Sequence, residues 1–342
     1  RGETVGTASM TDLPATMRVV SARMGGGPET LVAEDRPVPV PGPREVLVEV
    51  AATGINRGDI LQRARTYPAP PGTDYDVLGL EVSGRVVAAG DQVTLWKPGD
   101  RVCCLMKDGA YASHALADER LTMAVPENVD LAAAAALPEA LFTVWTNVFD
   151  RGGLKQGTRF LVHGASSGIG VIALQLGRAF GAEVIASTGS DAKGEICREL
   201  GAHHVINHRE SDFVEEAKRL TGGEGVDLIL DMVAGSYMQR NLEALALEGK
   251  VVMIGLLESD RADFAVGTLL TRRLTITGST LWARTIEQKA EIRQALDEKV
   301  RPLLESGAVR PVVDRVFPLE RAGEAHDFME TNSHVGKILL RP

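Results

Sequence analysis

Cysteine is scarce in this sequence, and its three copies form no bonding pattern. Cys103 and Cys104 are adjacent, so on a strand their side chains point to opposite faces, and Cys197 stands alone. This spacing fits neither a disulfide framework nor a cysteine-rich zinc site. It excludes the small disulfide-bonded secreted proteins and predicts a reducing compartment, which we take to be the cytoplasm.

Long apolar runs and an excess of positive charge are also missing. No stretch approaches the roughly 18 apolar residues that a membrane-spanning helix needs. Residues 1–16 contain no apolar signal segment, and we expect them to be a flexible leader. The net charge of −9 and the pI near 5.4 argue against nucleic acid or an anionic membrane as partner. The expected partner is therefore a small molecule.

The 342 residues suffice for two domains, and the pattern of strand and helix signals changes along the chain. From residue 17 to about 137, short β-rich runs are separated by Pro and Gly, with little helix. Residues 130–149 favour helix with a break at Pro138, and six apolar strands then alternate with helical segments. Such alternation specifies a doubly wound parallel sheet. We also expect a long charged helix over 285–306, a helix over 320–332 and strands at 311–319 and 336–342.

These patterns predict an α/β Rossmann domain with a six-stranded parallel sheet, inserted in a β-rich domain. The predicted boundaries are 138–281 for the Rossmann domain and 17–137 with 282–342 for the β-rich domain. The sheet should bind a nucleotide at the turn "HGASSGIG", residues 163–170, because this turn lies between a buried strand and a helix. Glycines let the backbone approach a pyrophosphate, and the helix N-terminus offers free N–H groups.

The same letters occur in the short-chain dehydrogenases, but the chemistry of that family is absent. It needs Tyr-x-x-x-Lys for proton transfer, and the residues four positions after the four tyrosines are Pro71, Gly79, Ala115 and Asn241. The turn also follows about 160 residues here, whereas in that family it follows the first strand.

The chain instead resembles the medium-chain dehydrogenase/reductase superfamily, and specifically its zinc-free quinone oxidoreductase branch. The stretches "LVEVAATGINRGDILQR", "VLGLEVSGRV", "LVHGASSGIGVIALQLGRAFGA" and "VGKILL" carry the resemblance. "LPEALFTVW" and "ILDMVAGSYMQRNLEALALEG" are similar to the stress-inducible quinone reductases of this branch. The resemblance implies that the β-rich domain is GroES-like and catalytic.

Zinc-dependent members of the superfamily hold the metal with a Cys after an early strand and with a Gly-His-Glu segment. In this sequence Asn56 stands in place of the Cys and Leu80 in place of the His, so only Glu81 remains. A catalytic zinc needs three protein ligands, so no metal is expected. Without this Lewis acid, quinones and conjugated enones are the expected substrates, because they already delocalise the incoming electrons.

The predicted cofactor is NADPH. An acidic residue usually ends the second strand of an NAD-binding sheet, but Ser187, Thr188, Gly189 and Ser190 follow each other here, with Lys193 one helical turn later. Hydroxyl groups and a lysine suit a 2′-phosphate. By resemblance, Gly189, Ser190 and Lys193 hold that phosphate, and His208 replaces a tyrosine near the adenosine.

The resemblance also assigns roles to further residues. Asn56 and Tyr67 are expected as the catalytic pair at an interdomain cleft, with Asn56 near the nicotinamide and Tyr67 over the substrate. No side chain stands out as an obligatory proton donor. The expected cofactor contacts are Thr143, Gly164, Ala165, Ser166, Gly168, Ile169, Gly170, Gly189, Ser190, Lys193, His208, Ile254, Gly255, Leu256, Ser279 and Asn332.

The predicted function is therefore NADPH-dependent quinone reduction by hydride transfer. Two alternatives stay open: an NADPH-dependent 2-enoyl or alkenal reductase, and a non-enzymatic NADPH-binding structural protein. The last Rossmann strand, residues 273–279, should lie at a sheet edge, and in this superfamily it pairs across a two-fold axis, so we expect a homodimer.

Overall fold

The computed structural model describes residues 13–22, 25–67 and 76–342. The chain forms two compact units. Unit 1 comprises residues 1–139, 282–305 and 311–342, and unit 2 comprises residues 140–281 and 306–310. Most of the expected leader, residues 1–12, lies outside the described part.

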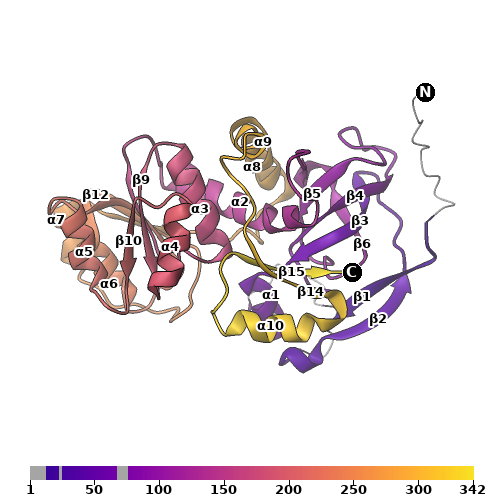
Figure 1. The fold of residues 1–342 in the computed structure, drawn as a ribbon, viewed down its shortest axis with the longest axis horizontal. Helices are drawn as coiled ribbons and strands as arrows, with labels where there is room; N and C mark the ends of the chain where they lie inside the picture. The colour runs from indigo at the N-terminus through magenta and orange to yellow at the C-terminus, as the bar shows by residue number, and fades with distance from the viewer. Residues whose placement is uncertain (1–12, 23–24, 68–75) are drawn as a thin grey trace. The chain divides into compact units, whose positions relative to one another are not determined.

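Unit 1 is built on a seven-stranded sheet in the order β14-β15-β3-β4-β5-β7, with β6 paired to β3 (Figure 1). β14 and β15 are parallel, and the other pairs in this sheet are antiparallel. A separate antiparallel pair, β1–β2, precedes it. The strands are β1 (Thr16–Ser21), β2 (Val32–Pro37), β3 (Glu45–Gly54), β4 (Glu81–Ala89), β5 (Arg101–Leu105), β6 (His114–Asp118), β7 (Thr122–Ala124), β14 (Val313–Pro318) and β15 (Lys337–Arg341).

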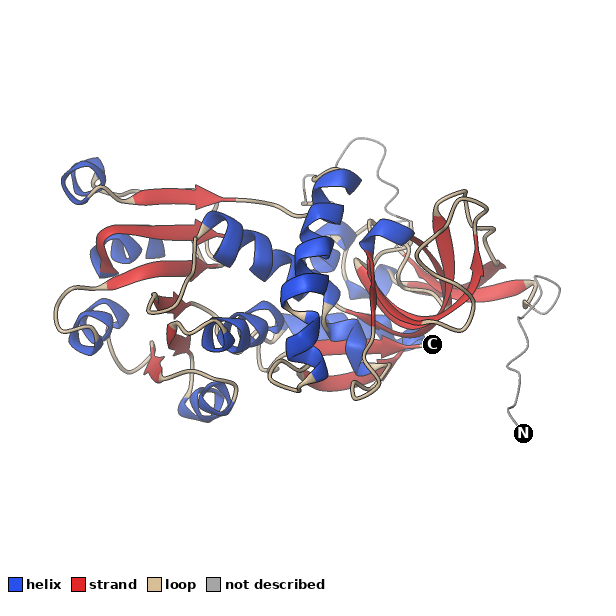
Figure 2. Cartoon of the chain, turned by 90° about the horizontal axis from the view of Figure 1, so that it is seen from above, coloured by secondary structure: helices blue, strands red, loops and turns tan. Residues whose placement is uncertain are grey.

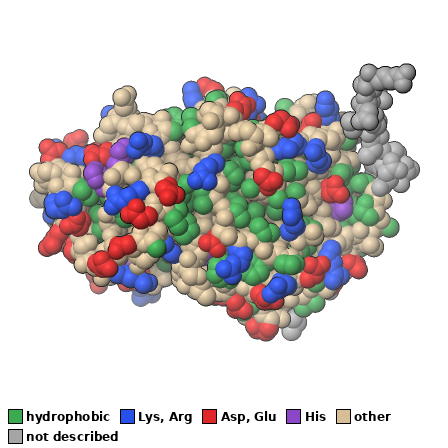
Figure 3. All heavy atoms as spheres, viewed as in Figure 1, with side chains coloured by type: hydrophobic (Ala, Val, Ile, Leu, Met, Phe, Trp, Pro, Cys, Tyr) green, Lys and Arg blue, Asp and Glu red, His purple; other side chains and the backbone are tan. Residues whose placement is uncertain are grey.

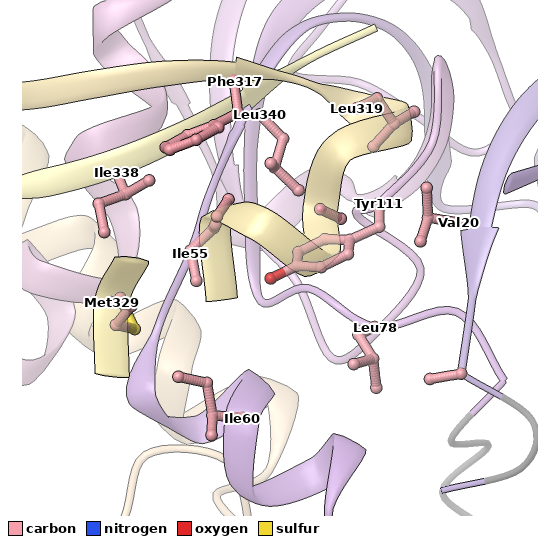
Figure 4. Close-up of a cluster of buried hydrophobic side chains, with 13 residues drawn as sticks. Val20, Ile55, Ile60, Leu78, Tyr111, Phe317, Leu319, Met329, Ile338 and Leu340 are labelled. Atoms are coloured by element: carbon pink, nitrogen blue, oxygen red, sulfur yellow. The ribbon is translucent and has the colours of Figure 1, made fainter. Parts of the chain in front are cut away.

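A core of unit 1 forms where elements from both ends of the chain meet. Ile55 after β3, Tyr111 before β6 and Ile338 on β15 pack with apolar residues of α1 and α10 (Figure 4). The helices of this unit are α1 (Arg57–Arg63), α8 (Ile286–Lys299), α9 (Arg301–Glu305) and α10 (Ala322–Glu330), with the first two residues of α2 (Pro138–Val144). The single helix expected over 285–306 is broken at Val300, because Pro302 lacks the N–H that would continue it. Helix α1 was not predicted.

Unit 2 is a six-stranded parallel sheet in the order β10-β9-β8-β11-β12-β13. In chain order this is 3-2-1-4-5-6, the Rossmann order, and the prediction of a doubly wound sheet is confirmed. Helices lie on both faces of the sheet (Figure 2). The elements are β8 (Arg159–Val162), α3 (Gly168–Ala179), β9 (Glu183–Thr188), α4 (Asp191–Glu199), β10 (His204–Asn207), α5 (Phe213–Leu220), β11 (Val226–Asp231), α6 (Tyr237–Ala244), β12 (Leu245–Met253), α7 (Val266–Arg272) and β13 (Thr275–Gly278).

The helix expected over 130–149 contains three kinds of turn. A 3₁₀ turn, η4 (Ala133–Ala136), precedes α2, and a π-helical segment, η5 (Trp145–Arg151), follows it. The break before Pro138 was predicted, whereas the π-helical turn was not. Among the described residues, no helix is both long and apolar enough to cross a membrane.

Candidate functional site

The glycine turn lies where a Rossmann sheet reverses its strand order. It connects β8 to α3, and β8 pairs with β9 on one side and with β11 on the other. Gly164 has a positive φ of 58°. Ser167 caps α3 by accepting the N–H of Gly170 at 3.0 Å. A Cβ on Gly170 would lie 2.5 Å from the carbonyl oxygens of Gly164 and Ala165, so only glycine fits at this position.

The other residues expected at this turn lie beside the helix start. Ala165 and Ser166 are buried, and Gly168 and Ile169 open α3. The first N–H groups of a helix have no partner within the helix, so this end of α3 offers donors to an anion. The geometry fits a pyrophosphate.

A buried network fixes the neighbouring strand end and was missed by sequence reasoning. The Asp231 carboxylate, at the end of β11, accepts the N–H of Val233 at 2.7 Å and the Asn241 amide at 3.0 Å. Asn241 Oδ1 in turn lies 2.8 Å from His163 Nε2, so this ring nitrogen carries the hydrogen. Burial lowers the pKa of His163, which keeps the ring neutral. The network ties the start of the glycine turn, just after β8, to α6 and to the end of β11.

The end of β9 carries hydroxyl and basic groups instead of an acid. Ser190 is the N-cap of α4, where its Oγ accepts the N–H of Lys193 at 3.3 Å, and Thr188 Oγ1 donates to the Ser190 carbonyl at 3.1 Å. A Cβ on Gly189 would meet the side chains of His208 and Arg209 at 3.5 Å and 3.4 Å, so both lie beside this glycine. Burial, followed by Arg209, lowers the pKa of His208.

Two features of the structure bear on the expected 2′-phosphate site. Gly189, Ser190, Lys193 and His208 lie near one another, and Arg209 adds a second cation that the sequence did not single out. The Asp191 carboxylate accepts the Asn207 amide at 3.0 Å at the start of α4, where the helix dipole favours a negative charge.

The residues expected around the nicotinamide lie at the ends of β12 and β13. Ile254 donates its N–H to the Asp231 carbonyl at 2.8 Å, and a Cβ on Gly255 would lie 3.0 Å from the Met232 carbonyl oxygen. Ser279 Oγ bonds Asn147 Oδ1 at 2.7 Å, and the Asn147 amide donates to the Thr143 carbonyl at 2.8 Å. Thr143 and Ser279 are therefore linked through the π-helical segment.

Asn56, Tyr67 and Asn332 belong to unit 1. Asn56 is buried just after β3 and is the N-cap of α1. Its Nδ2 donates to Glu81 Oε1 at 2.9 Å, and its Oδ1 accepts the ammonium of Lys337. Asn332 has a φ of 54°, and its Oδ1 accepts Arg57 at 2.6 Å, next to Asn56 along the chain.

Lys337 completes a buried charged cluster around Asn56. Its Nζ lies 2.5 Å from Glu81 Oε1, and the other carboxylate oxygen of Glu81 accepts the N–H of Glu139 at 2.8 Å. Burial, and then the charge of Glu81, raise the pKa of the Glu139 carboxyl to about 7. Neither Lys337 nor Glu139 was predicted.

This cluster does not suit zinc. The positions that hold the metal in zinc-dependent relatives are an amide, an apolar side chain and a carboxylate here, and an ammonium donates to the amide and the carboxylate. A metal needs the lone pairs that these hydrogen bonds use. Among the described residues, no group of three or more His, Cys, Asp or Glu could hold a metal ion.

A second buried network lies beneath Asn56. Asp59 Oδ2 accepts the Asn56 N–H at 2.8 Å and lies 3.1 Å from the Tyr111 hydroxyl, which is 2.8 Å from His326 Nε2. Burial raises the pKa of Asp59 to about 7 and lowers that of His326 to about 3. His326 is therefore neutral, and its Nδ1 accepts from Arg63 at 3.1 Å.

Tyr67 packs against Trp282, with ring centroids 5.1 Å apart. The indole N–H of Trp282 donates to the Lys107 carbonyl at 2.8 Å, and buried Lys289 donates to the Trp282 carbonyl at 3.0 Å. Burial, and then the charge of Glu139, raise the pKa of Tyr67. The sequence after Tyr67, "PAPPG" at residues 68–72, predicts a stiff connector that could hold this tyrosine in place, and these residues lie outside the described part of the chain.

Family comparisons agree with both units. Residues 42–127 match the alcohol dehydrogenase GroES-like domain, and residues 168–299 match the zinc-binding dehydrogenase family. The quinone oxidoreductase of Rattus norvegicus is 33% identical over 327 residues, which cover 95% of this chain and 97% of that protein.

Two solved structures are similar over almost the whole chain. The Escherichia coli quinone oxidoreductase complexed with NADPH has a TM-score of 0.85 and 30% identity, covering 95% of this chain and 100% of that one. The CurK enoyl reductase has a TM-score of 0.85 and 27% identity, covering 95% and 99%. The chain thus belongs to the zinc-free quinone oxidoreductase branch of the medium-chain dehydrogenase/reductase superfamily and is an oxidoreductase that uses a nicotinamide cofactor.

Proposed function

We propose that the protein is an NADPH-dependent quinone oxidoreductase, with unit 2 as the cofactor-binding domain and unit 1 as the catalytic domain. The single observation that supports it best is the 33% identity to a quinone oxidoreductase over 95% of the chain. The proposed catalytic residues are Asn56 and Tyr67, and the proposed cofactor contacts are those expected from the sequence, with Arg209 added.

The preference for NADPH rests on the end of β9. Arg209 supplies positive charge beside Gly189, Lys193 adds a cation in the first turn of α4, and Ser190 supplies a hydroxyl group. A 2′-phosphate gains charge-assisted hydrogen bonds from such groups, whereas the ribose hydroxyls of NADH lack the acid that usually binds them.

Each part of the chain has a role in the proposed reaction. Bound NADPH supplies the hydride. The N-terminus of α3 binds the pyrophosphate, and the groups after β12 and β13 orient the nicotinamide. Tyr67 and Trp282 offer an aromatic surface to a planar quinone, and Asn56 offers an amide N–H to the quinone oxygen, where negative charge develops.

The test is steady-state oxidation of NADPH and NADH with an ortho-quinone, a para-quinone, an enone and a 2-enoyl thioester. We expect quinone turnover with NADPH preferred over NADH. In the double variant Lys193→Ala/Arg209→Ala, the Kd for NADPH should rise about tenfold or more, because charged hydrogen bonds contribute about 1.5–3 kcal/mol each. The Kd for NADH should not change, which makes it the matched control.

Two other functions remain as outcomes of this test. The similarity to the CurK enoyl reductase supports 2-enoyl reduction as the second candidate, and turnover of the thioester but of no quinone would establish it. Saturable NADPH binding without turnover of any acceptor would establish the non-enzymatic alternative.

We also propose a homodimer through β13. This strand is the last of the sheet order, so one side of it pairs with no other strand among the described residues. Large apolar side chains are exposed on α7, the helix that precedes β13 in the chain, with 60% of Val266 and 75% of Leu270 accessible. An open strand edge with exposed apolar side chains is normally covered by another chain.

A cytoplasmic location completes the proposal, since all three cysteines are buried free thiols. On the face drawn in Figure 3, the acidic and basic side chains of the described residues are interspersed.

A further inference from the structure

The cluster of Asn56, Glu81 and Lys337 is formed where three strand ends of unit 1 meet. Asn56 lies two residues after β3, Glu81 opens β4, and Lys337 opens β15. The N–H of Ile55 donates to the Ile338 carbonyl at 2.9 Å, which fixes β15 beside the end of β3. All three side chains are buried, with 8% of Asn56, none of Glu81 and 3% of Lys337 exposed.

The backbone of β3 leaves room for the Glu81 side chain of this cluster. A Cβ on Gly54 would overlap the Glu81 carboxylate and would lie 2.8 Å from the Ala135 carbonyl oxygen. Only glycine therefore lets the carboxylate lie against β3. Thr53 Oγ1 also donates to the Glu81 carbonyl at 2.7 Å, so Glu81 is held at both its backbone and its side chain.

The hydrogen bonds leave the Asn56 amide only one orientation. Lys337 can only donate, so the Asn56 atom that faces it is the carbonyl oxygen. The Glu81 carboxylate can only accept, so the atom that faces it is the amide nitrogen. A flipped amide would place oxygen against carboxylate and N–H against ammonium, and both contacts are repulsive.

One N–H of the Asn56 amide remains unused among its contacts with the described residues, because the group carries two hydrogens and donates one to Glu81. A fixed donor of this kind stabilises negative charge that develops on a carbonyl oxygen, without reorganisation during the reaction. If the amide flipped, it would offer an acceptor to that oxygen instead.

We propose that Lys337 is a positioning residue for Asn56. Its ammonium takes the place of the metal ion of zinc-dependent relatives as a built-in cation. Together with Glu81, Lys337 holds the Asn56 amide so that the free N–H of the amide faces the substrate oxygen. The inference rests on the proposed function, because it assigns Asn56 to the reducible oxygen of a quinone or enone. Lys337 acts through Asn56 and need not touch the substrate.

The deciding variant is Lys337→Met/Glu81→Gln. It removes both charges together, so no uncompensated ion stays buried, and the fold should persist. The glutamine introduced by Glu81→Gln can pair with either orientation of the Asn56 amide, so orientation control is lost. A misplaced catalytic group costs up to about a hundredfold, and we expect kcat for the quinone to fall about tenfold to a hundredfold. The Kd for NADPH, measured by fluorescence titration, should change less than about twofold, because its phosphate groups bind elsewhere.

The matched control is Arg44→Met/Glu119→Gln. Arg44 bonds the buried carboxylate of Glu119 at 2.9 Å, near the start of β3. The ten residues of β3 place this pair roughly 30 Å from Asn56. It should lose as much stability as the test variant or more, yet keep the wild-type kcat.

A second pair of variants keeps the test decisive if the double variant does not fold. Lys337→Arg retains a cationic donor and should keep more of kcat than Lys337→Met. Asn56→Asp retains attraction to Lys337 but removes the amide donor, and its kcat should fall by a similar factor.

The outcomes separate this inference from the proposed function. If the wild type reduces the quinone and the kcat of the double variant stays within about twofold of the wild-type kcat, the positioning role of Lys337 is refuted. If the double variant does not fold, an unchanged kcat in Asn56→Asp refutes the positioning role instead. If the wild type reduces only the enone, the quinone assignment fails, and the comparison of variants is made on the enone. If no acceptor is reduced, the proposed function itself fails.

Discussion

Replacing Asp59 by Asn should change how the stability of unit 1 depends on pH. Asp59 is fully buried, and its pKa rises from 3.8 to about 7 in the folded protein, chiefly because burial disfavours the charged form. Between these two values the folded protein holds a proton at Asp59 that the unfolded chain has released. The free energy of unfolding therefore falls as the pH rises through this window, by about 4 kcal/mol in total.

The Asp59→Asn variant lacks this dependence, because its amide does not titrate. From pH 5 to pH 8, the free energy of unfolding of the wild type should therefore fall by about 3 kcal/mol relative to that of the variant. The Asn carbonyl oxygen can still accept the Asn56 N–H and the Tyr111 hydroxyl. Glu139, whose pKa is also about 7, titrates in both proteins, and the largest cause of its shift, burial, is common to both; the smaller contribution from the charge of Asp59 is lost in the variant.

Urea unfolding followed by tryptophan fluorescence measures this difference. Trp96 and Trp282 belong to unit 1, and Trp145 belongs to unit 2, so a Trp145→Phe background reports on unit 1 alone. Asp35→Asn, at a carboxyl that is 66% exposed, is the control for the same change of side chain at the surface of unit 1. A difference between Asp59→Asn and its parent that stays constant from pH 5 to pH 8 would refute the reasoning.

Three further predictions follow from features of the site and of the sheet edge. Gly170→Ala places a Cβ 2.5 Å from two carbonyl oxygens, so it should lower the free energy of unfolding by about 1–3 kcal/mol. It should also weaken NADPH binding in a fluorescence titration, and an unchanged affinity would contradict the proposed pyrophosphate site. Prolonged dialysis against EDTA should leave quinone turnover unchanged, and activity that is lost and then restored by zinc would overturn the account of Lys337. Leu270→Glu places a charge at a side chain that is 75% exposed, and sedimentation should find a monomer where the wild type is a dimer; a wild type that is already monomeric would refute the proposed interface.

The sequence predicted those parts of the molecule whose signals are local. The turn at residues 163–170 could be recognised because a strand, three glycines and a helix lie within about twenty residues, and the six-stranded parallel sheet followed from regular alternation of strands and helices. Asn56 could be proposed only because of the resemblance, since nothing in its own neighbourhood marks it as unusual.

The charged cluster could not be predicted in the same way. Lys337 lies 256 positions from Glu81 along the chain, and only the pairing of β15 with β3 brings them together. Arg209 was missed for a related reason: it follows β10, and its closeness to Gly189 depends on the pairing of β10 with β9. Tertiary pairing, not local propensity, places these cations.

The return of the chain to unit 1 has a consequence for biosynthesis. Unit 2 is nearly continuous in sequence, so it can fold once residue 310 has left the ribosome, while unit 1 still lacks β14 and β15. Lys337 opens β15 and is therefore synthesised after every other member of its cluster. Until it arrives, Glu81 lacks the ammonium of Lys337 and cannot be buried at low cost, so unit 1 of the nascent chain should stay open and sensitive to protease until β15 has emerged.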